Sequence, residues 1–132
     1  RAENYLPIAT FQHFEYYTYA AQPNQIRDAE RMIKAGAVIV SGSQAHQPQG
    51  LEFYKNAFIH YGLGNLFFDQ YHYCTDNACD DGFIDMHYFY NGEYLGNELI
   101  TIVFEDYARP RLMTPEEREV LLNKVFSASN WQ

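Results

Sequence analysis

Hydrophobic positions in the first forty residues change period twice. Residues 5–11 form a short apolar run with strand character, and a stretch of helical spacing begins at Pro23. In that stretch four apolar residues fall on one face: Ile26, Ala29, Met32 and Ile33. Proline suits the first turn of a helix, and Gly36 supplies a C-terminal stop.

A second buried-strand run, residues 37–40, follows that helix and gives way to Ser41-Gly42-Ser43. Strand, helix and strand in this order predict a βαβ unit, with a parallel pair of strands and a right-handed crossover. On the outer face of the helix, Glu30 and Lys34 are spaced to pair one turn apart. The carboxyl ends of the two strands should therefore meet at one edge of a sheet.

The period changes again in the second half of the chain. Residues 58–61 predict a short strand that ends in the glycine turn 62–65, where the glycines allow a positive φ or a close backbone approach. Strands at residues 83–90 and 93–104 flank Asn91-Gly92, a dipeptide typical of two-residue type I′ hairpin turns. Alternation places one set of side chains on a single face of each strand. In the first strand this set is Ile84, Met86, Tyr88 and Tyr90, and in the second it is Leu95, Leu99, Thr101 and Val103.

A closing helix is predicted after Thr114. Thr114 and Glu117 have the spacing of a capping box, with Pro115 at the first helical position. Leu121, Leu122 and Val125 should point inward, and the end should fray over residues 127–132. The pattern as a whole predicts an α+β fold, in which a βαβ unit is followed by an antiparallel hairpin and a C-terminal helix. The hairpin should extend a sheet packed against the first.

Composition narrows the functional classes. With 132 residues the chain can build one small domain with a modest core. A net charge of −8 and the lack of any Lys/Arg cluster argue against nucleic acid as a partner. No apolar stretch is long enough to span a membrane, so no membrane contact is expected from this segment. The 12 Tyr and 10 Phe can fill a sheet core or form a binding face, and a core role is favoured for most of them.

The segment 71–82 differs in character from its surroundings. Cys74 and Cys79 are close enough for a small disulfide loop in an oxidising compartment, and paired free thiols are the alternative. The segment also contains three acidic residues, Asp76, Asp80 and Asp81. They do not form an EF-hand calcium loop, because no Glu stands at the closing position of that motif. We expect a solvated acidic surface loop.

Two histidines lie where the predicted parallel strands end. His13 follows the first strand, and His46 stands four residues after Gly42 on the loop that leaves the second. Because catalytic and ligand-binding groups collect on such loops, both imidazoles are candidates to reach one centre. A single strand-end histidine is, by itself, more often a hydrogen-bonded structural residue. His60 and His87, which lie inside strands, are expected to be structural.

The stretch from His46 to residue 70 resembles the bacterial capsule-synthesis CapA family, also called the poly-γ-glutamate synthesis family. The likeness is carried by His46, Gln49, Glu52, Ile59, Tyr61-Gly62-Leu63-Gly64-Asn65 and Phe67-Phe68-Asp69-Gln70. It extends back to Gln12-His13-Phe14 and forward to Arg109-Pro110-Arg111. That family belongs to the calcineurin-like metallophosphoesterase superfamily. The resemblance implies that residues 1–132 are the C-terminal portion of a single domain, one half of a four-layer αββα sandwich whose N-terminal half is absent.

For the site, the resemblance implies His13 and His46 as metal ligands and catalytic residues, and divalent Mn, Zn or Fe as the cofactor, with up to two ions in the full-length protein. Gln44 stands where the family has the first histidine of a Gly-His-x-His motif, and as an amide it is a weaker metal ligand. In the family's His-Trp-Gly segment, Phe14 and Glu15 replace the Trp and Gly here. Further ligands, aspartates and an Asn-His pair, belong upstream, so this chain alone should be inactive.

Asn65 and Asp69 are candidates to bind substrate, although a turn cap and a structural hydrogen bond are the alternatives for them. The implied activity is metal-dependent hydrolysis of phosphoester or related bonds, with an anionic polymer or phosphoester as substrate. A non-catalytic component of a cell-surface polymer machine is the alternative, suggested by Gln44. An extracytoplasmic location through an upstream membrane anchor is implied, and without the N-terminal half one apolar sheet face should be uncovered.

Overall fold

The computed structural model describes residues 5–67, 79–106 and 109–131. Within them lie seven strands and two helices in mixed order, as the α+β prediction requires. These are β1 (Ile8–Gln12), α1 (Pro23–Lys34), β2 (Ile39–Ser43), β3 (Leu51–Tyr54), β4 (Ala57–His60), β5 (Asp81–Tyr90), β6 (Glu93–Glu105), β7 (Arg109–Leu112) and α2 (Pro115–Ser127). None of the helices in these ranges is long and apolar enough to cross a membrane.

The first sheet has the order β1-β2-β4-β3. Strands β1 and β2 are parallel, which confirms the predicted βαβ arrangement. Strand β2 does not end at Val40, as the sequence predicts, but continues to Ser43, because its backbone still pairs with β1 at Gln12. Strand β3 was not predicted; it pairs antiparallel with β4 through a tight turn at Lys55 and Asn56, both with positive φ.

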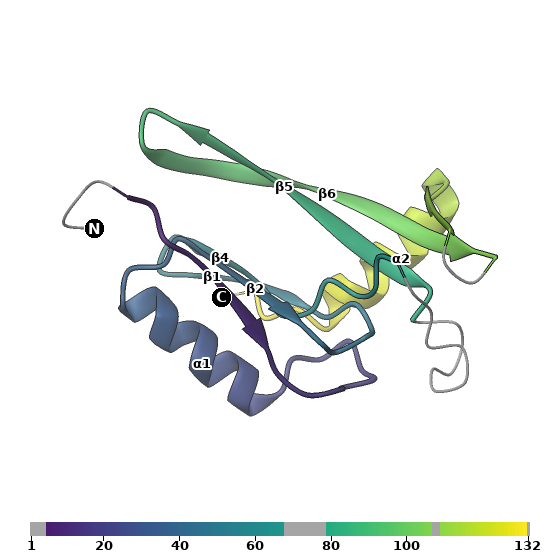
Figure 1. The fold of residues 1–132 in the computed structure, drawn as a ribbon, viewed down its shortest axis with the longest axis horizontal. Helices are drawn as coiled ribbons and strands as arrows, with labels where there is room; N and C mark the ends of the chain where they lie inside the picture. Colours follow the sequence, from purple (N-terminus) through teal and green to yellow (C-terminus); the bar gives the residue numbers. More distant parts are fainter. Residues whose placement is uncertain (1–4, 68–78, 107–108, 132) are drawn as a thin grey trace.

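Helix α1 covers one face of this sheet (Figure 1). Ala29 and Ile33 pack against Val40 and Ile59 in a first core cluster. Met32, which belongs to the predicted apolar face, is 37% exposed, whereas the polar Gln25 is buried. The predicted Glu30–Lys34 pair is present at 2.8 Å.

The second sheet, of order β5-β6-β7, lies over the opposite face of the first sheet (Figure 1). Its hairpin turn is the predicted one, with φ of 48° at Asn91 and 79° at Gly92. A second core cluster fills the space between the sheets and against α2; its buried members are Val38, Ile39, Leu51, Phe58, Phe83, Leu121 and Val125. The molecule therefore has a helix, a sheet and a second sheet as successive layers, with α2 beside them.

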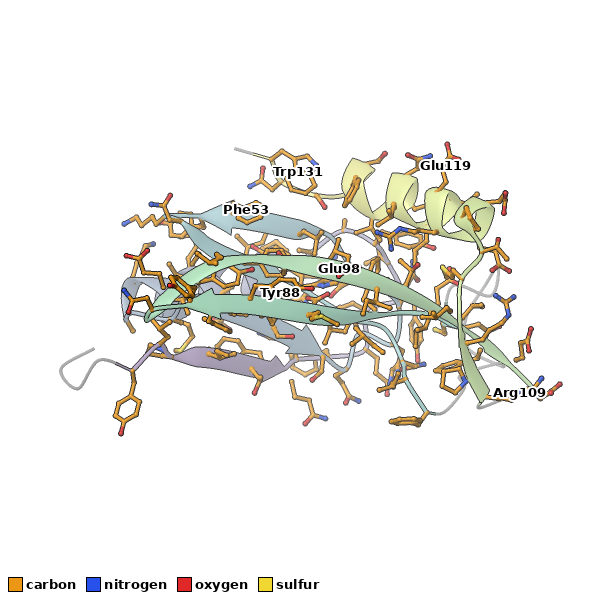
Figure 2. All side chains as sticks on the ribbon, turned by 90° about the horizontal axis from the view of Figure 1, so that it is seen from above. Phe53, Tyr88, Glu98, Arg109, Glu119 and Trp131 are labelled. Atoms are coloured by element: carbon orange, nitrogen blue, oxygen red, sulfur yellow. The ribbon has the colours of Figure 1, made fainter. Side chains whose placement is uncertain are left out.

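The four apolar residues predicted to share a face of β5 do so, but that face points outward. Figure 2 looks onto it, at Tyr88 and Glu98. The exposed fractions are 42% for Ile84, 43% for Met86, 47% for Tyr88 and 74% for Tyr90. An uncovered apolar sheet face was expected, and this is where it lies. On β6 the predicted face is interrupted, because a β-bulge near Gly96 leaves Leu95 64% exposed.

Helix α2 begins with the predicted capping box. Thr114 Oγ1 accepts from the backbone N–H of Glu117, and Leu121 and Val125 are buried. The predicted fraying after residue 127 is wrong for residues 127–131. The backbone N–H of Leu51 donates to Ser129 Oγ (2.8 Å), and the N–H of Asn130 donates to the carbonyl of Leu51 (3.3 Å), so the C-terminal segment is tied to β3.

Candidate functional site

The loop after β2 leaves the sheet in an unusual backbone conformation. Gln44 has a φ of 76° and His46 a φ of 61°, a region that costs a non-glycine residue about 1–2 kcal/mol. Just before it, a Cβ on Gly42 would lie 2.0 Å from the carbonyl oxygen of Tyr61. The close backbone approach predicted for the glycine turn 62–65 is present at Gly64, and Gly42 adds a second one. Left-handed backbone at two nearby polar residues is typical of a functional loop that its surroundings hold in place.

His46 is buried and held by an amide. Its Nδ1 lies 2.9 Å from Asn65 Oδ1, while Asn65 Nδ2 donates to the carbonyl of Cys79 (3.3 Å). The second bond orients the amide so that its oxygen faces the imidazole. Nδ1 must then carry a hydrogen, which it donates to the amide oxygen. Asn65 thus links the His46 loop to Cys79 rather than capping its own turn.

The loop after β1 brings a carboxylate to the other side of the same imidazole. Glu15 Oε1 lies 3.4 Å from His46 Nε2. The hydroxyl of Tyr17 donates to Glu15 Oε2 at 3.0 Å, and its ring stacks on His46 with centroids 6.2 Å apart. Sequence reasoning did not select Glu15. The available signal was that a carboxylate replaces the glycine of the family's His-Trp-Gly segment.

The other predicted ligands have different neighbours. His13 packs against α1, where its Nε2 lies 3.5 Å from Asp28 Oδ2 and its ring lies 5.2 Å from that of Phe11. Gln44 Oε1 accepts from Gln12 Nε2 at 2.5 Å, so β1 and β2 are joined there by an amide pair. Asp69, a predicted substrate-binding residue, lies outside the described residues.

A metal ion would find a partial donor set here. No group of three or more His, Cys, Asp or Glu side chains is arranged to hold a metal among the residues that the structure describes. One imidazole nitrogen and one carboxylate oxygen do face each other, and this pair suits Mn, Zn or Fe. The arrangement fits a divalent ion that needs further ligands.

Two buried residues carry the family resemblance without an obvious chemical role. Glu52 is buried and accepts a 2.5 Å hydrogen bond from the Tyr61 hydroxyl. Burial, and then this bond, raise the pKa of Tyr61. Gln49 is also buried, accepts from Gln25 Nε2 (2.7 Å) and packs where a Cβ on Gly62 would stand. Gln49 thus joins α1 to the glycine turn, and Glu52 holds Tyr61 next to that turn.

His60 and His87 have the structural surroundings that were predicted. His60 is fully buried, and its Nδ1 lies 2.7 Å from Asp85 Oδ2, which joins β4 of the first sheet to β5 of the second. His87 lies 3.5 Å from the hydroxyl of Tyr94, and burial lowers its pKa. Neither ring belongs to the His46 loop.

The acidic segment is less solvated than predicted where the structure describes it. Cys79 is buried and disulfide-bonded; Cys74, its predicted partner, lies outside the described residues, as does Asp76. Asp81 is the first residue of β5, and burial raises its pKa to about 6.

Comparison with known proteins agrees with the sequence pattern. A family model described as "Bacterial capsule synthesis protein PGA_cap" matches residues 2–70, which is more than half of the chain. The capsule biosynthesis protein CapA of Bacillus anthracis is 41% identical over 56 residues, a match that covers 42% of this chain and 14% of that protein. The matched part of the chain contains β1 to β4 and the whole His46 loop. The chain belongs to the bacterial capsule synthesis family of CapA.

Proposed function

We propose that this chain supplies part of a metal-dependent hydrolase that acts on phosphoester or related bonds during production of a capsule or poly-γ-glutamate. The observation that carries the proposal is the setting of His46. It is a buried imidazole with Nδ1 fixed by Asn65 and Nε2 directed toward a carboxylate, at the carboxyl end of a parallel strand. Metal-ligating histidines have this arrangement, in which the second ring nitrogen donates to an oxygen acceptor.

The roles follow from the contacts. His46 would hold a divalent ion, with His13 and Gln44 as the further ligands predicted from the family pattern. When bound, such an ion polarises a phosphoryl oxygen and lowers the pKa of a water molecule. Asn65 holds the imidazole in the required tautomer. Contact of Asn65 and Asp69 with substrate stays a prediction.

The fold supports a larger assembly. The helix–sheet–sheet layering leaves Ile84, Met86, Tyr88 and Tyr90 exposed on the outer face of β5. In the four-layer αββα sandwich that we propose, the N-terminal half of the domain covers this face. An extracytoplasmic location through an upstream anchor belongs to the same proposal, and the disulfide at Cys79 supports an oxidising compartment.

A non-catalytic role in the same polymer machinery is the second candidate, because Gln44 is bonded to Gln12 and an amide binds metal weakly. The substitution Gln44→His separates the two. In a working site the new imidazole should strengthen metal binding and hydrolysis of an aryl phosphodiester. In a decayed scaffold hydrolysis should stay absent.

The principal experiment is metal analysis of the parent protein and its His46→Ala variant. We expect the parent to retain Mn, Zn or Fe and the variant to lose it together with hydrolysis. Circular dichroism should confirm that the variant is folded, and Glu119→Gln, an exposed change on α2 (Figure 2), is the matched control. Equal metal content in the parent and the His46→Ala variant would contradict the proposal.

A further inference from the structure

We propose that Glu15 binds the same divalent cation as His46, and that the hydroxyl of Tyr17 positions it. This inference rests on the proposed metal-dependent function and adds a carboxylate ligand at a position where the family pattern has glycine. Glu15 lies on the β1–α1 connection and His46 on the β2–β3 connection, so the two parallel strands bring them to one edge of the sheet.

The first step is the orientation of the His46 ring, which Asn65 fixes. Asn65 Nδ2 donates to the carbonyl of Cys79, so the amide can offer only its oxygen to the imidazole. His46 Nδ1 is therefore the donor, and Nε2 lies on the side of Glu15.

The second step is the contact itself. His46 Nε2 and Glu15 Oε1 face each other at 3.4 Å. Ligand atoms at about 2.1 Å from a tetrahedral ion lie about 3.4 Å from each other, by simple geometry from ordinary Zn–N and Zn–O lengths. The observed spacing therefore needs no rearrangement to accept an ion.

The third step is support for each ligand. Tyr17 donates to Glu15 Oε2, which leaves Oε1 for His46, and the Tyr17 ring stacks on the imidazole. Asn65 in turn holds the imidazole by accepting a hydrogen bond from His46 Nδ1. A hydrogen-bonded carboxylate beside a hydrogen-bonded imidazole is the usual support around a protein metal ion.

The neighbouring candidates explain why a carboxylate is needed. Gln44 is a neutral amide whose oxygen already accepts from Gln12, and His13 lies against Asp28. Glu15 adds a formal negative charge next to a doubly charged ion, which an amide does not. Glu15 thus compensates for the weaker metal binding of Gln44, which stands where the family pattern has a histidine.

The test uses Mn²⁺ alone as probe, because this paramagnetic ion broadens nearby nuclear magnetic resonance signals even when it binds weakly. Titrations of the 132-residue chain should broaden the signals of Glu15, Tyr17 and His46 first. Glu15→Gln should raise the Mn²⁺ midpoint about tenfold or more, and Tyr17→Phe should raise it by a smaller factor, since it removes a hydrogen bond to the ligand and not the ligand's charge. Glu119→Gln should leave it unchanged, and His46→Ala should abolish the local broadening.

The outcomes separate this inference from the proposed function. If His46→Ala removes the broadening while Glu15→Gln leaves the midpoint unchanged, Glu15 is not a ligand and only the metal site at His46 stands. If the unmodified chain shows no broadening near His46, the Glu15–His46 pair does not hold the ion and this inference is overturned. The proposed function is tested separately, by the metal content of the parent protein. The same spectra report whether each variant is folded.

Discussion

Replacement of Asp81 by Asn should stabilise the fold at neutral pH. Asp81 begins β5 and lines a cavity of about 360 Å³ between β6 and α2, next to Val103, Met113 and Leu121. Burial raises the pKa of this carboxyl from 3.8 to about 6, although the charge of Lys124 opposes the shift. Asp81 is therefore mostly charged at pH 7, and this charge costs more free energy in the folded chain than in the unfolded chain.

The magnitude follows from the shift. A rise of about two pKa units corresponds to about 3 kcal/mol at 1.36 kcal/mol per unit. Asp81 keeps some contact with solvent, and its attraction to Lys124 disappears in the variant, so we expect about 1–2 kcal/mol of stabilisation from Asp81→Asn. The size of this stabilisation depends on pH. The stability that neutral Asp81 contributes is fully present below pH 3.8 and is lost as pH rises through about 6. The advantage of the variant should appear between these values and be constant above them.

The assay is urea unfolding of the unmodified chain and of Asp81→Asn at several pH values from 3.5 to 8, taking the difference in free energy of unfolding at each pH. The fluorescence of Trp131, whose ring packs against Phe126, provides the signal. Glu119→Gln removes an exposed carboxylate from α2 and serves as the control. A variant that is less stable at pH 7.5, or a difference that does not change with pH, would refute the reasoning.

Three further substitutions test the packing. Gly42→Ala places a methyl group 2.0 Å from the carbonyl oxygen of Tyr61. We expect the free energy of unfolding, measured in urea, to fall by about 3 kcal/mol, or the chain to fail to fold. A fall below about 1 kcal/mol would contradict the close approach. Thr114→Ala removes the cap of α2 and should cost about 1 kcal/mol by thermal unfolding, and an unchanged midpoint would argue against the cap. Asp85→Ala leaves buried His60 without its partner and should cost about 3 kcal/mol or more, whereas replacing both by leucine should recover part of this loss. A double variant no more stable than Asp85→Ala would contradict this reasoning.

Local sequence signals predicted several elements well. The capping box at Thr114, the Asn91-Gly92 turn and the proline that starts α1 each depend on residues within a few positions of one another. The predictions failed where a distant partner decides the outcome. Strand β3 exists because it pairs with β4, and residues 129–130 are ordered because they bond to β3.

Sequence alone also could not tell which face of β5 points inward. Alternation groups Ile84 with Met86, and it equally groups Phe83 with Asp85. Only the position of the first sheet selects the second set as the inner one, through the bond between Asp85 and His60. Apolar character alone favours the face that proves to be exposed.

By itself the sequence determined the family, the βαβ unit and the hairpin, and it marked His46, because these depend on residue types at short and fixed spacings. The tertiary structure alone decided that Asn65 orients His46, that Glu15 faces its second nitrogen and that His13 packs against α1. The physical reason is that a side chain's direction is set by contacts between segments far apart in the chain. Hydrophobic period and turn chemistry place a residue at the edge of a sheet but do not choose its neighbours there.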